Sequence, residues 1–359
     1  MKKIPATVIT GFLGSGKTTL IRHMLENANG RRIALIINEF GDLGIDRDIV
    51  QGCGIEGCED DDVVELANGC ICCTVADDFL PVMEALIDRE VAPDHIVIET
   101  SGLALPKPLI RAFNWPEIKT RVTVDGVVSV VDGPALAAGQ FASNEAAVDA
   151  QRKADDNLDH VNALEDLFED QLHAADMVLL NKVDALKDGE EQSLISDLKN
   201  KLRPGVHIVG TSHGNVGVDV LLGLDAGVED DLDVRHSHHE HPHDHDHDHH
   251  HHHYHDHHHE HDHSHDDFES FIVDVGTQSN PAQLESRLIE LVEHHGILRI
   301  KGFVEVEGKS ARHVVQGVGT RFTRYFDRPW ADGENRQGRL VVIGLSGLDQ
   351  AAISSALGA

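Results

Sequence analysis

The chain has 359 residues, of which 40% are apolar and 4% aromatic, enough to bury the core of one large or two medium globular domains. Its 62 acidic and 30 basic residues give a formal net charge of −32, which repels phosphate backbones and argues against a nucleic-acid partner. No run of about 18 apolar residues is present, so no membrane-spanning helix is expected. The first residues lack the apolar core of a signal peptide, and we therefore expect a cytoplasmic protein.

Short apolar runs alternate with helix-like stretches over residues 1–225. Continuous apolar strands separated by helices are typical of a parallel sheet that is covered on both faces, with its chemistry at the carboxyl ends of the strands. We therefore predict an α/β domain with a mostly parallel sheet for this part of the chain. Its strands are expected at residues 6–10, 33–37, 95–99, 127–131, 177–180 and 206–210.

The first predicted strand leads into GFLGSGKT, residues 11–18, which matches the P-loop pattern G-x-x-x-x-G-K-[ST] between a strand and a helix. Glycines allow the backbone N–H groups to face phosphates, and the helix N-terminus adds positive potential. Lys17 is expected to reach the β- and γ-phosphates and is a predicted catalytic residue, and Thr18 is expected to ligate Mg²⁺. The pattern predicts a P-loop NTPase. Its phosphate-binding residues are expected to be Gly11, Gly14, Ser15, Gly16, Lys17, Thr18 and Thr19.

The choice of base is indicated by Asn181-Lys182-Val183-Asp184, directly after the predicted strand 177–180. In GTPases, a sequence of this form reads guanine. The Asp184 carboxylate would accept hydrogen bonds from N1–H and N2–H₂ of the base, a donor pair that adenine lacks. Asn181, Lys182 and Asp184 are therefore predicted to bind GTP rather than ATP.

Two acidic segments follow predicted strands and are candidates for the γ-phosphate side of the site. Glu99-Thr100-Ser101-Gly102 lies where a Walker-B carboxylate meets Mg²⁺, so Glu99 is a predicted catalytic residue and Gly102 a predicted γ-phosphate contact. Residues 39–46 form a candidate switch, in which Glu39 and Asp42 are either Mg²⁺ or water ligands or parts of a plain solvated turn.

All five cysteines fall within residues 53–73, and three of them, Cys70, Cys72 and Cys73, fall within four residues. Clustered cysteines in the cytoplasm point to metal or redox chemistry rather than to structural disulfides. Thiolates favour Zn²⁺, Co²⁺ and Cu(I), and a C-x-C-C run leaves a coordination position open, as an exchangeable site requires. The alternatives are small buried side chains or a redox pair. The role of Cys53 and Cys58 stays open.

The composition changes sharply over residues 226–267, where 19 of the 28 histidines are interleaved with acidic residues. This stretch cannot bury a core, so a disordered linker is predicted, either a metal reservoir or a merely solvated tract. Residues 268–359 are predicted to form a small α+β domain. Its strands are expected at 271–275, 297–306, 311–318 and 339–345, with a helix opened by Asn280-Pro281 and a short C-terminal helix.

Taken together, GFLGSGKTT, ELANGCICCTV, ETSG, VDG and NKVD resemble the CobW family of P-loop GTPases, relatives of the nickel-insertion GTPases UreG and HypB. The resemblance covers the whole chain, including the C-terminal domain. It implies a metal site at Cys70, Cys72 and Cys73 whose affinity depends on Mg²⁺ and GTP. The sequence is most similar to the branch that serves cobalamin biosynthesis, which implies Co²⁺ as the metal and a cobaltochelatase as a client metalloenzyme.

The function expected from the sequence is therefore a GTP-dependent metallochaperone that favours Co²⁺. It would bind the metal with Mg²⁺ and GTP and release it to a client on hydrolysis. Hydrolysis is expected to be slow without a partner, since no arginine finger is evident. The alternatives are a zinc chaperone, a histidine-rich metal buffer with incidental GTPase activity and a small-molecule kinase. The guanine motif argues against the kinase.

Overall fold

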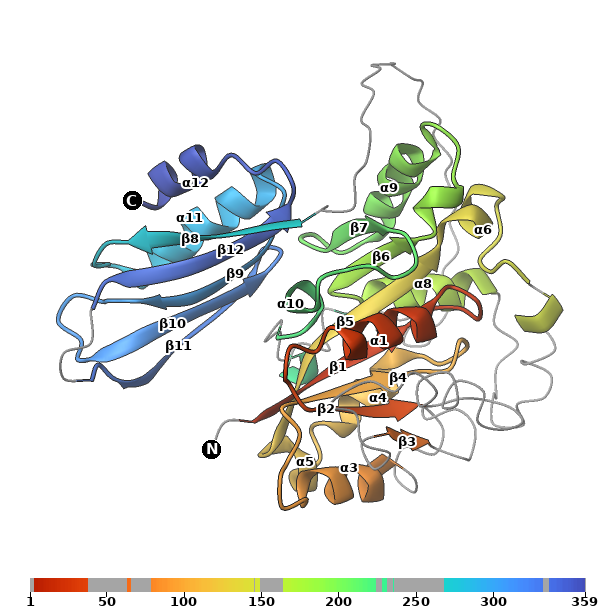
Figure 1. The fold of residues 1–359 in the computed structure, drawn as a ribbon, viewed down its shortest axis with the longest axis horizontal. Helices are drawn as coiled ribbons and strands as arrows, with labels where there is room; N and C mark the ends of the chain where they lie inside the picture. The colour runs from red at the N-terminus through yellow and green to blue at the C-terminus, as the bar shows by residue number, and fades with distance from the viewer. Residues whose placement is uncertain are drawn as a thin grey trace, which may run out of the picture.

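The computed structural model describes residues 3–37, 63–65, 79–144, 146–148, 164–223, 228–230, 235, 268–331 and 336–358. They form two sheets (Figure 1): seven parallel strands in the order β3-β2-β4-β1-β5-β6-β7, and five antiparallel strands in the order β11-β10-β9-β12-β8. The predicted class, an α/β P-loop fold followed by a small α+β unit, is confirmed. Among the helices of the described residues, none has the length and apolar character needed to cross a membrane.

Every apolar run predicted as a strand of the first sheet forms one. β5 begins five residues earlier than predicted. The prediction missed its start because Thr123 and Asp125 interrupt the apolar run there. The structure adds β3, whose three residues are too few to make a recognisable run and which pairs with β2 through Leu35 and Val63. The strands are β1 Ile4–Thr10, β2 Ile33–Ile37, β3 Val63–Glu65, β4 His95–Glu99, β5 Val122–Asp132, β6 Met177–Asn181 and β7 His207–Thr211.

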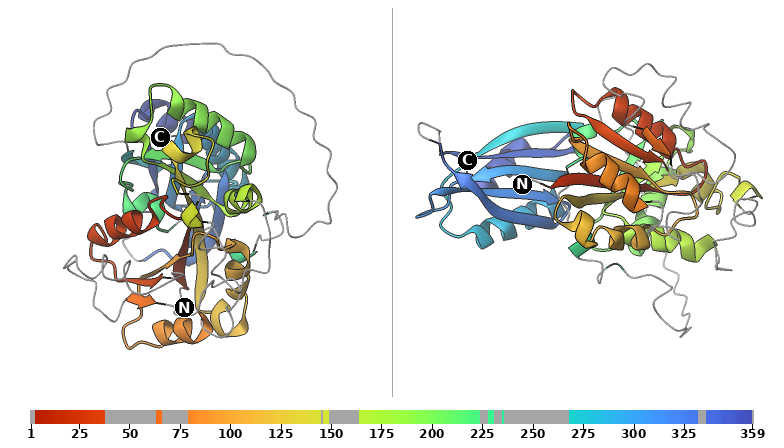
Figure 2. Two further views of the ribbon diagram at one scale, coloured as in Figure 1. Left: turned by 90° about the vertical axis from the view of Figure 1, so that its right-hand side faces the viewer. Right: turned by 90° about the horizontal axis from the view of Figure 1, so that it is seen from below.

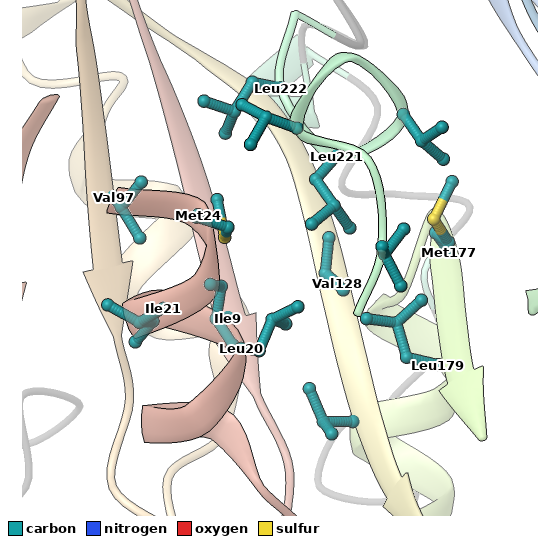
Figure 3. Packing of buried hydrophobic residues seen from close by; sticks show 14 of the residues in the cluster. Ile9, Leu20, Ile21, Met24, Val97, Val128, Met177, Leu179, Leu221 and Leu222 are labelled. Carbon is teal, nitrogen blue, oxygen red and sulfur yellow. The ribbon is translucent and has the colours of Figure 1, made fainter. Parts of the chain in front are cut away.

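Both faces of the parallel sheet are buried, as its continuous apolar strands require. On one face, Leu20, Ile21 and Met24 of α1 lie over Ile9 and Val97 (Figure 3). The other face is covered by α3, α4 and α5, and α8 and α9 pack over β6 (Figure 2). The helices of this part are α1 Lys17–Glu26, α3 Leu80–Ile87, α4 Pro106–Ala112, α5 Pro116–Lys119, α6 Gly133–Ala137, α8 Leu164–Ala174, α9 Glu190–Lys201 and α10 Val218–Leu221, with the 3₁₀ turns η3 Val183–Ala185 and η4 Val228–Asp230.

The second sheet carries its helices on one face. The Asn280 side chain accepts a hydrogen bond from Ala282 N at 3.0 Å, so α11 begins at the predicted cap. The sequence analysis missed one strand, β11, whose three arginines hide its alternation and which lies at the exposed edge of the sheet, where charged residues are common. The elements are β8 Phe268–Val275, α11 Pro281–His294, β9 Ile297–Val304, β10 Ala311–Val318, β11 Arg321–Pro329, β12 Gly338–Leu345 and α12 Gln350–Leu357.

The two sheets share a packed junction. Leu298 of β9 and Ile343 of β12 are buried in the same apolar cluster as α1 and α10. Beside them, the buried Arg299 guanidinium donates to Asp219 O at 2.6 Å and to Leu222 O, the carbonyls at the end of α10. Since these last-turn carbonyls have no partner within the helix, the arginine acts as a C-cap supplied by the other sheet.

Part of the stretch predicted as a linker is packed against the first sheet. Val228 is fully buried, and the Glu229 carboxylate accepts from Val124 N at 2.8 Å and from the Thr123 hydroxyl at 2.7 Å. Arg235 is 1% exposed and donates to Asp176 at 2.6 Å. The prediction that the linker begins at residue 226 is wrong for these residues, because polar groups of β5 and α8–β6 bind them. The histidine-rich part, residues 236–267, lies outside the described residues.

A buried polar chain crosses the amino-terminal half of the parallel sheet. His95 Nε2 lies 2.8 Å from the Thr7 hydroxyl, which donates to Asp125 at 3.4 Å, so the imidazole is the donor to Thr7. Asp125 also accepts from Gly223 N, next to the Arg299 junction. Burial, together with the charges of Arg31 and Arg299, lowers the pKa of His95 to about 3.

We expect this histidine to make the protein sensitive to acid. His95 stays neutral in the folded protein but binds a proton near pH 6.5 when unfolded, so stability falls as the pH drops below 6.5 towards 3. At pH 5 the loss from His95 is about 2 kcal/mol. Urea unfolding at pH 7 and pH 5 tests this. His95→Gln keeps a donor to Thr7. In this variant, the difference in the free energy of unfolding between pH 7 and pH 5 should shrink by that amount, and an unchanged difference would contradict the assignment.

Candidate functional site

The P-loop joins β1 to α1 and requires glycine at both of its ends. Gly11 has φ +138°, and a Cβ there would lie 2.2 Å from Val130 O of the neighbouring strand β5. Gly16, the N-cap of α1, has φ +105°, and a Cβ there would lie 2.2 Å from Asn181 Nδ2. The loop is therefore held between the backbone of β5 and the start of the predicted guanine motif.

Lys17 and Ser15 turn donor groups into the loop. Lys17 is 7% exposed, and its Nζ donates to Gly11 O at 2.8 Å and to Phe12 O at 3.3 Å. The buried Ser15 hydroxyl has no hydrogen-bond partner within the described part of the chain, and such a group costs about 1–3 kcal/mol when left without a ligand. Phosphate oxygens match this set of donors. Thr18 is half-buried and Thr19 exposed on the first turn of α1.

The predicted γ-phosphate segment lies against the P-loop. Glu99 is 5% exposed at the end of β4, opposite Ile9 of β1, and Thr100 N donates to Ile9 O at 2.9 Å. Gly102 is so close that a Cβ would lie 2.7 Å from Leu13 N. The carboxylate and the glycine therefore end up beside the phosphate-binding loop, although they are about 85 residues away from it in the chain.

Asn181 and Lys182 fasten the guanine motif to the P-loop. Asn181 Nδ2 donates to Ser15 O at 2.8 Å, and its Oδ1 accepts from Gly214 N at 3.2 Å. Lys182 has φ +63°, and its Nζ donates to Gly14 O at 2.7 Å. Two side chains of one motif thus hold the P-loop and the loop predicted to read the base together.

Asp184 lies at the open side of this motif. Its side chain is 47% exposed, and Oδ2 lies 3.8 Å from Nε2 of His213. His213 and Gly214 both have positive φ, and a Cβ on Gly214 would lie 2.8 Å from Leu20 Cα, so the turn after β7 is pressed against α1. The sequence analysis assigned no role to this turn. The available signal was its position, since it is a polar segment directly after a predicted strand.

Asp132, in one of the two VDG sequences, is a further group beside the site to which the sequence analysis assigned no role. Its side chain is fully buried at the end of β5 and accepts from Lys182 Nζ at 2.6 Å, from Ser143 and from Ala135 N at 3.1 Å. Burial alone raises the pKa of Asp132, but the hydrogen bonds from Lys182, Ser143 and Ala135 outweigh it, and the pKa lies below its usual range. An acidic residue at the end of a predicted parallel strand was the available signal.

The predicted metal ligands Cys70, Cys72 and Cys73 lie outside the described residues, as do Cys53, Cys58 and the candidate switch at 39–46. The structure does describe β3, the strand that precedes the three thiols, and it runs parallel to β2. Strand β3 therefore ends at the same edge of the sheet as β1 and β4, five residues before Cys70.

Both parts of the chain match described families. Residues 5–210 match the CobW/HypB/UreG nucleotide-binding domain, and residues 249–359 match the cobalamin synthesis protein cobW C-terminal domain. The first match covers more than half of the chain and contains the P-loop, Glu99 and the guanine motif.

Curated relatives are similar over nearly their whole length. A Sinorhizobium sp protein named Zinc chaperone CobW is 52% identical over 355 residues, 99% of this chain and 96% of that one. A Pseudomonas aeruginosa protein of the same name is 52% identical over 361 residues, 99% of this chain and 91% of that one. Zinc chaperone YjiA of Escherichia coli is 27% identical over 354 residues, 96% and 95% of the two chains. The chain therefore belongs to the CobW/HypB/UreG family, and it is a GTPase.

Proposed function

We propose that this GTPase is a metallochaperone that holds a divalent metal ion at the thiolates of Cys70, Cys72 and Cys73. The metal is bound while Mg²⁺ and GTP occupy the P-loop, and it passes to a client metalloenzyme after hydrolysis. Zn²⁺ is the first candidate, since both relatives at 52% identity are named zinc chaperones. Co²⁺ is the second, because thiolates bind it as well, though less tightly than Zn²⁺. A cobaltochelatase is a client that would require Co²⁺.

The observation that carries the proposal is the position of β3. It lies three strand spacings from β1, about 14 Å across the sheet, and both strands end at the same edge. The thiols begin five residues beyond β3, and the candidate switch at 39–46 begins directly after β2, the strand between β3 and β4. This order supports a coupling of nucleotide state to thiol geometry, because the segments that carry both follow strands that end at one edge of the sheet.

The described residues fit GTP in chemical terms. The glycine-lined loop, the Lys17 ammonium and the Ser15 hydroxyl suit phosphate oxygens, and Asp184 supplies acceptors for the guanine N1–H and N2–H₂. Thr18 and Glu99 are the oxygen ligands proposed for Mg²⁺, which when bound neutralises charge on the β- and γ-phosphates. Lys17, already held inside the loop, is proposed to stabilise the same charge as the terminal phosphoryl group leaves.

The test is metal affinity as a function of nucleotide. We expect Zn²⁺ and Co²⁺ to bind at least about tenfold more tightly with Mg²⁺ and a non-hydrolysable GTP analogue than with Mg²⁺ and GDP, a typical coupling between two sites. Thiolate-to-Co²⁺ charge-transfer absorption reports binding at cysteine, and competition with Zn²⁺ gives its affinity. In Cys72→Ser, the tight site and its absorption band should be lost.

Two controls make the result specific. Cys53→Ser removes a thiol outside the C-x-C-C run, and deletion of residues 236–265 removes the histidine-rich stretch. We expect both variants to keep one tight site in the GTP-analogue state. Equal affinity in the two nucleotide states, or unchanged affinity in Cys72→Ser, would contradict the chaperone proposal. Loss of most metal capacity on deletion would favour the metal buffer instead.

A further inference from the structure

Asp132 is buried at the end of β5, beside the guanine motif. The Cα partner of Asp132 in the sheet is Asn181, so the end of β5 lies directly beside the first residue of the guanine motif. A Cβ on the next residue, Gly133, would lie 2.9 Å from Asn181 O, so the two strand ends leave no room for a side chain between them. This register brings the Asp132 carboxylate against the following residue, Lys182.

The contact with Lys182 is the strongest of the three that Asp132 makes to side chains and backbone. The ammonium lies 2.6 Å from Asp132 Oδ2, and the Asp132 side chain is 0% exposed while that of Lys182 is 36% exposed. Charge-assisted hydrogen bonds of this length are short and strong, and a buried carboxylate needs such a partner. Oδ2 also accepts from Ser143, and Oδ1 caps α6 through Ala135 N, so the rotamer of Asp132 is fixed from both sides.

Lys182 connects the fixed Asp132 side chain to the P-loop. Its Nζ donates to Gly14 O at 2.7 Å at the same time as to Asp132. A lysine has a long flexible stem, and without a second partner its ammonium would leave the Gly14 carbonyl for water. The Asp132 carboxylate therefore keeps Lys182 on the phosphate-binding loop.

We infer that Asp132 is a positioning residue for the GTPase reaction, which acts through Lys182 to keep the guanine loop and the P-loop together and so prolongs the residence of the guanine nucleotide. The inference rests on the proposed guanine site at Asn181, Lys182 and Asp184. It concerns the lifetime of the complex, and it makes Asp132 neither a nucleotide ligand nor a catalytic residue.

The test is a double-mutant cycle on the full chain, with dissociation of a fluorescent GDP in the presence of Mg²⁺ as the readout. Serine at position 132 is a good N-cap for α6 but is too short and uncharged to hold Lys182. We expect Asp132→Ser and Lys182→Met each to raise the dissociation rate roughly 10- to 100-fold, the range of a hydrogen bond to a charged group. The double variant should dissociate no faster than Lys182→Met alone.

The outcomes of this cycle distinguish positioning of Lys182 by Asp132 from a purely structural role of Asp132. A cap or packing role would act in the Lys182→Met background too, so multiplied effects in the double variant would overturn the inference, as would an unchanged rate in Asp132→Ser. Should Asp132→Ser not fold, Asp132→Asn keeps the shape and the cap, loses the charge and enters the same cycle. If Lys182→Met has no effect while Asp184→Asn does, the inference is wrong and the guanine site stands. If neither has an effect, the proposed guanine site is wrong as well.

Discussion

Replacing Asp184 with asparagine is expected to lower the affinity for GDP and GTP roughly 100- to 10,000-fold, since two hydrogen bonds to a charged acceptor are lost. The asparagine amide would present a donor to N–H groups of guanine that are donors themselves. Xanthine carries a carbonyl where guanine has N2–H₂, so the variant should bind XDP more tightly than GDP. Such a reversal of base preference is not a consequence of damage to the fold, because Asp184 is about half exposed.

The affinities for GDP, XDP and ADP are measured by competition with a fluorescent nucleotide. This nucleotide is a fluorescent GDP for the parent protein and a fluorescent XDP for the variant. Asp188→Asn is the matched control, since it is the same chemical change at an exposed position four residues further along. We expect the control to bind like the parent protein. An Asp184→Asn protein with unchanged GDP affinity would show that the base is read elsewhere, and the guanine assignment of Asn181-Lys182-Val183-Asp184 would fall.

Replacing Arg299 with methionine is expected to uncouple the two sheets. Methionine keeps the apolar stem but leaves the carbonyls of Asp219 and Leu222 without their donor at a buried junction. Each buried acceptor left unpaired costs about 1–3 kcal/mol, so the loss for the two carbonyls is about 2–6 kcal/mol. This is a large fraction of the stability of a typical domain.

The two tryptophans allow the effect to be followed in each part separately. Trp115 precedes α5 beside the parallel sheet, and Trp330 is 7% exposed and packs on Phe303 in the antiparallel sheet. In single-tryptophan versions of the parent, we expect the urea transitions reported by Trp115 and by Trp330 to coincide. In the same versions of Arg299→Met, we expect the two transitions to separate.

Arg339→Met is the matched control for this experiment. Its side chain is 56% exposed, and its guanidinium pairs with the half-exposed Asp274 in the same sheet. A pair at the surface contributes at most about 1 kcal/mol, so this variant should unfold nearly as the parent does. Transitions that stay coincident and unshifted in Arg299→Met would show that the junction does not depend on this arginine.

Local chemistry made much of the fold predictable. The strands β2 and β4 have the predicted bounds, because a strand covered on both faces carries a continuous apolar run, which is residues 33–37 in β2 and 96–98 in β4. The start of α11 follows from Asn280 and Pro281, since a cap and a fixed φ act within one turn. The P-loop follows from glycines whose backbone conformation no other residue adopts easily.

Other elements depend on partners that are distant in the chain. The polar start of β5 pairs with β1, and Glu229, about 105 residues away, binds Thr123 and the backbone of Val124. Within the described part of the chain, the edge strand β11 pairs with a strand on one side only, so charged residues are tolerated there and its alternation is hidden. The prediction of a linker from residue 226 failed for Arg235, which resembles a solvated residue in the sequence but is paired with Asp176 in the interior.

By itself, then, the sequence determined the P-loop, the order of the parallel strands along the chain and the motif proposed to read guanine, since each of these depends on residues that are neighbours in the chain. Only the tertiary structure decided that Asp132 holds Lys182, that Arg299 caps α10 and that Glu99 lies beside the P-loop. Each of these contacts joins residues that the chain keeps far apart, and a pattern of neighbouring residues carries no information about which distant group will satisfy a buried charge or carbonyl.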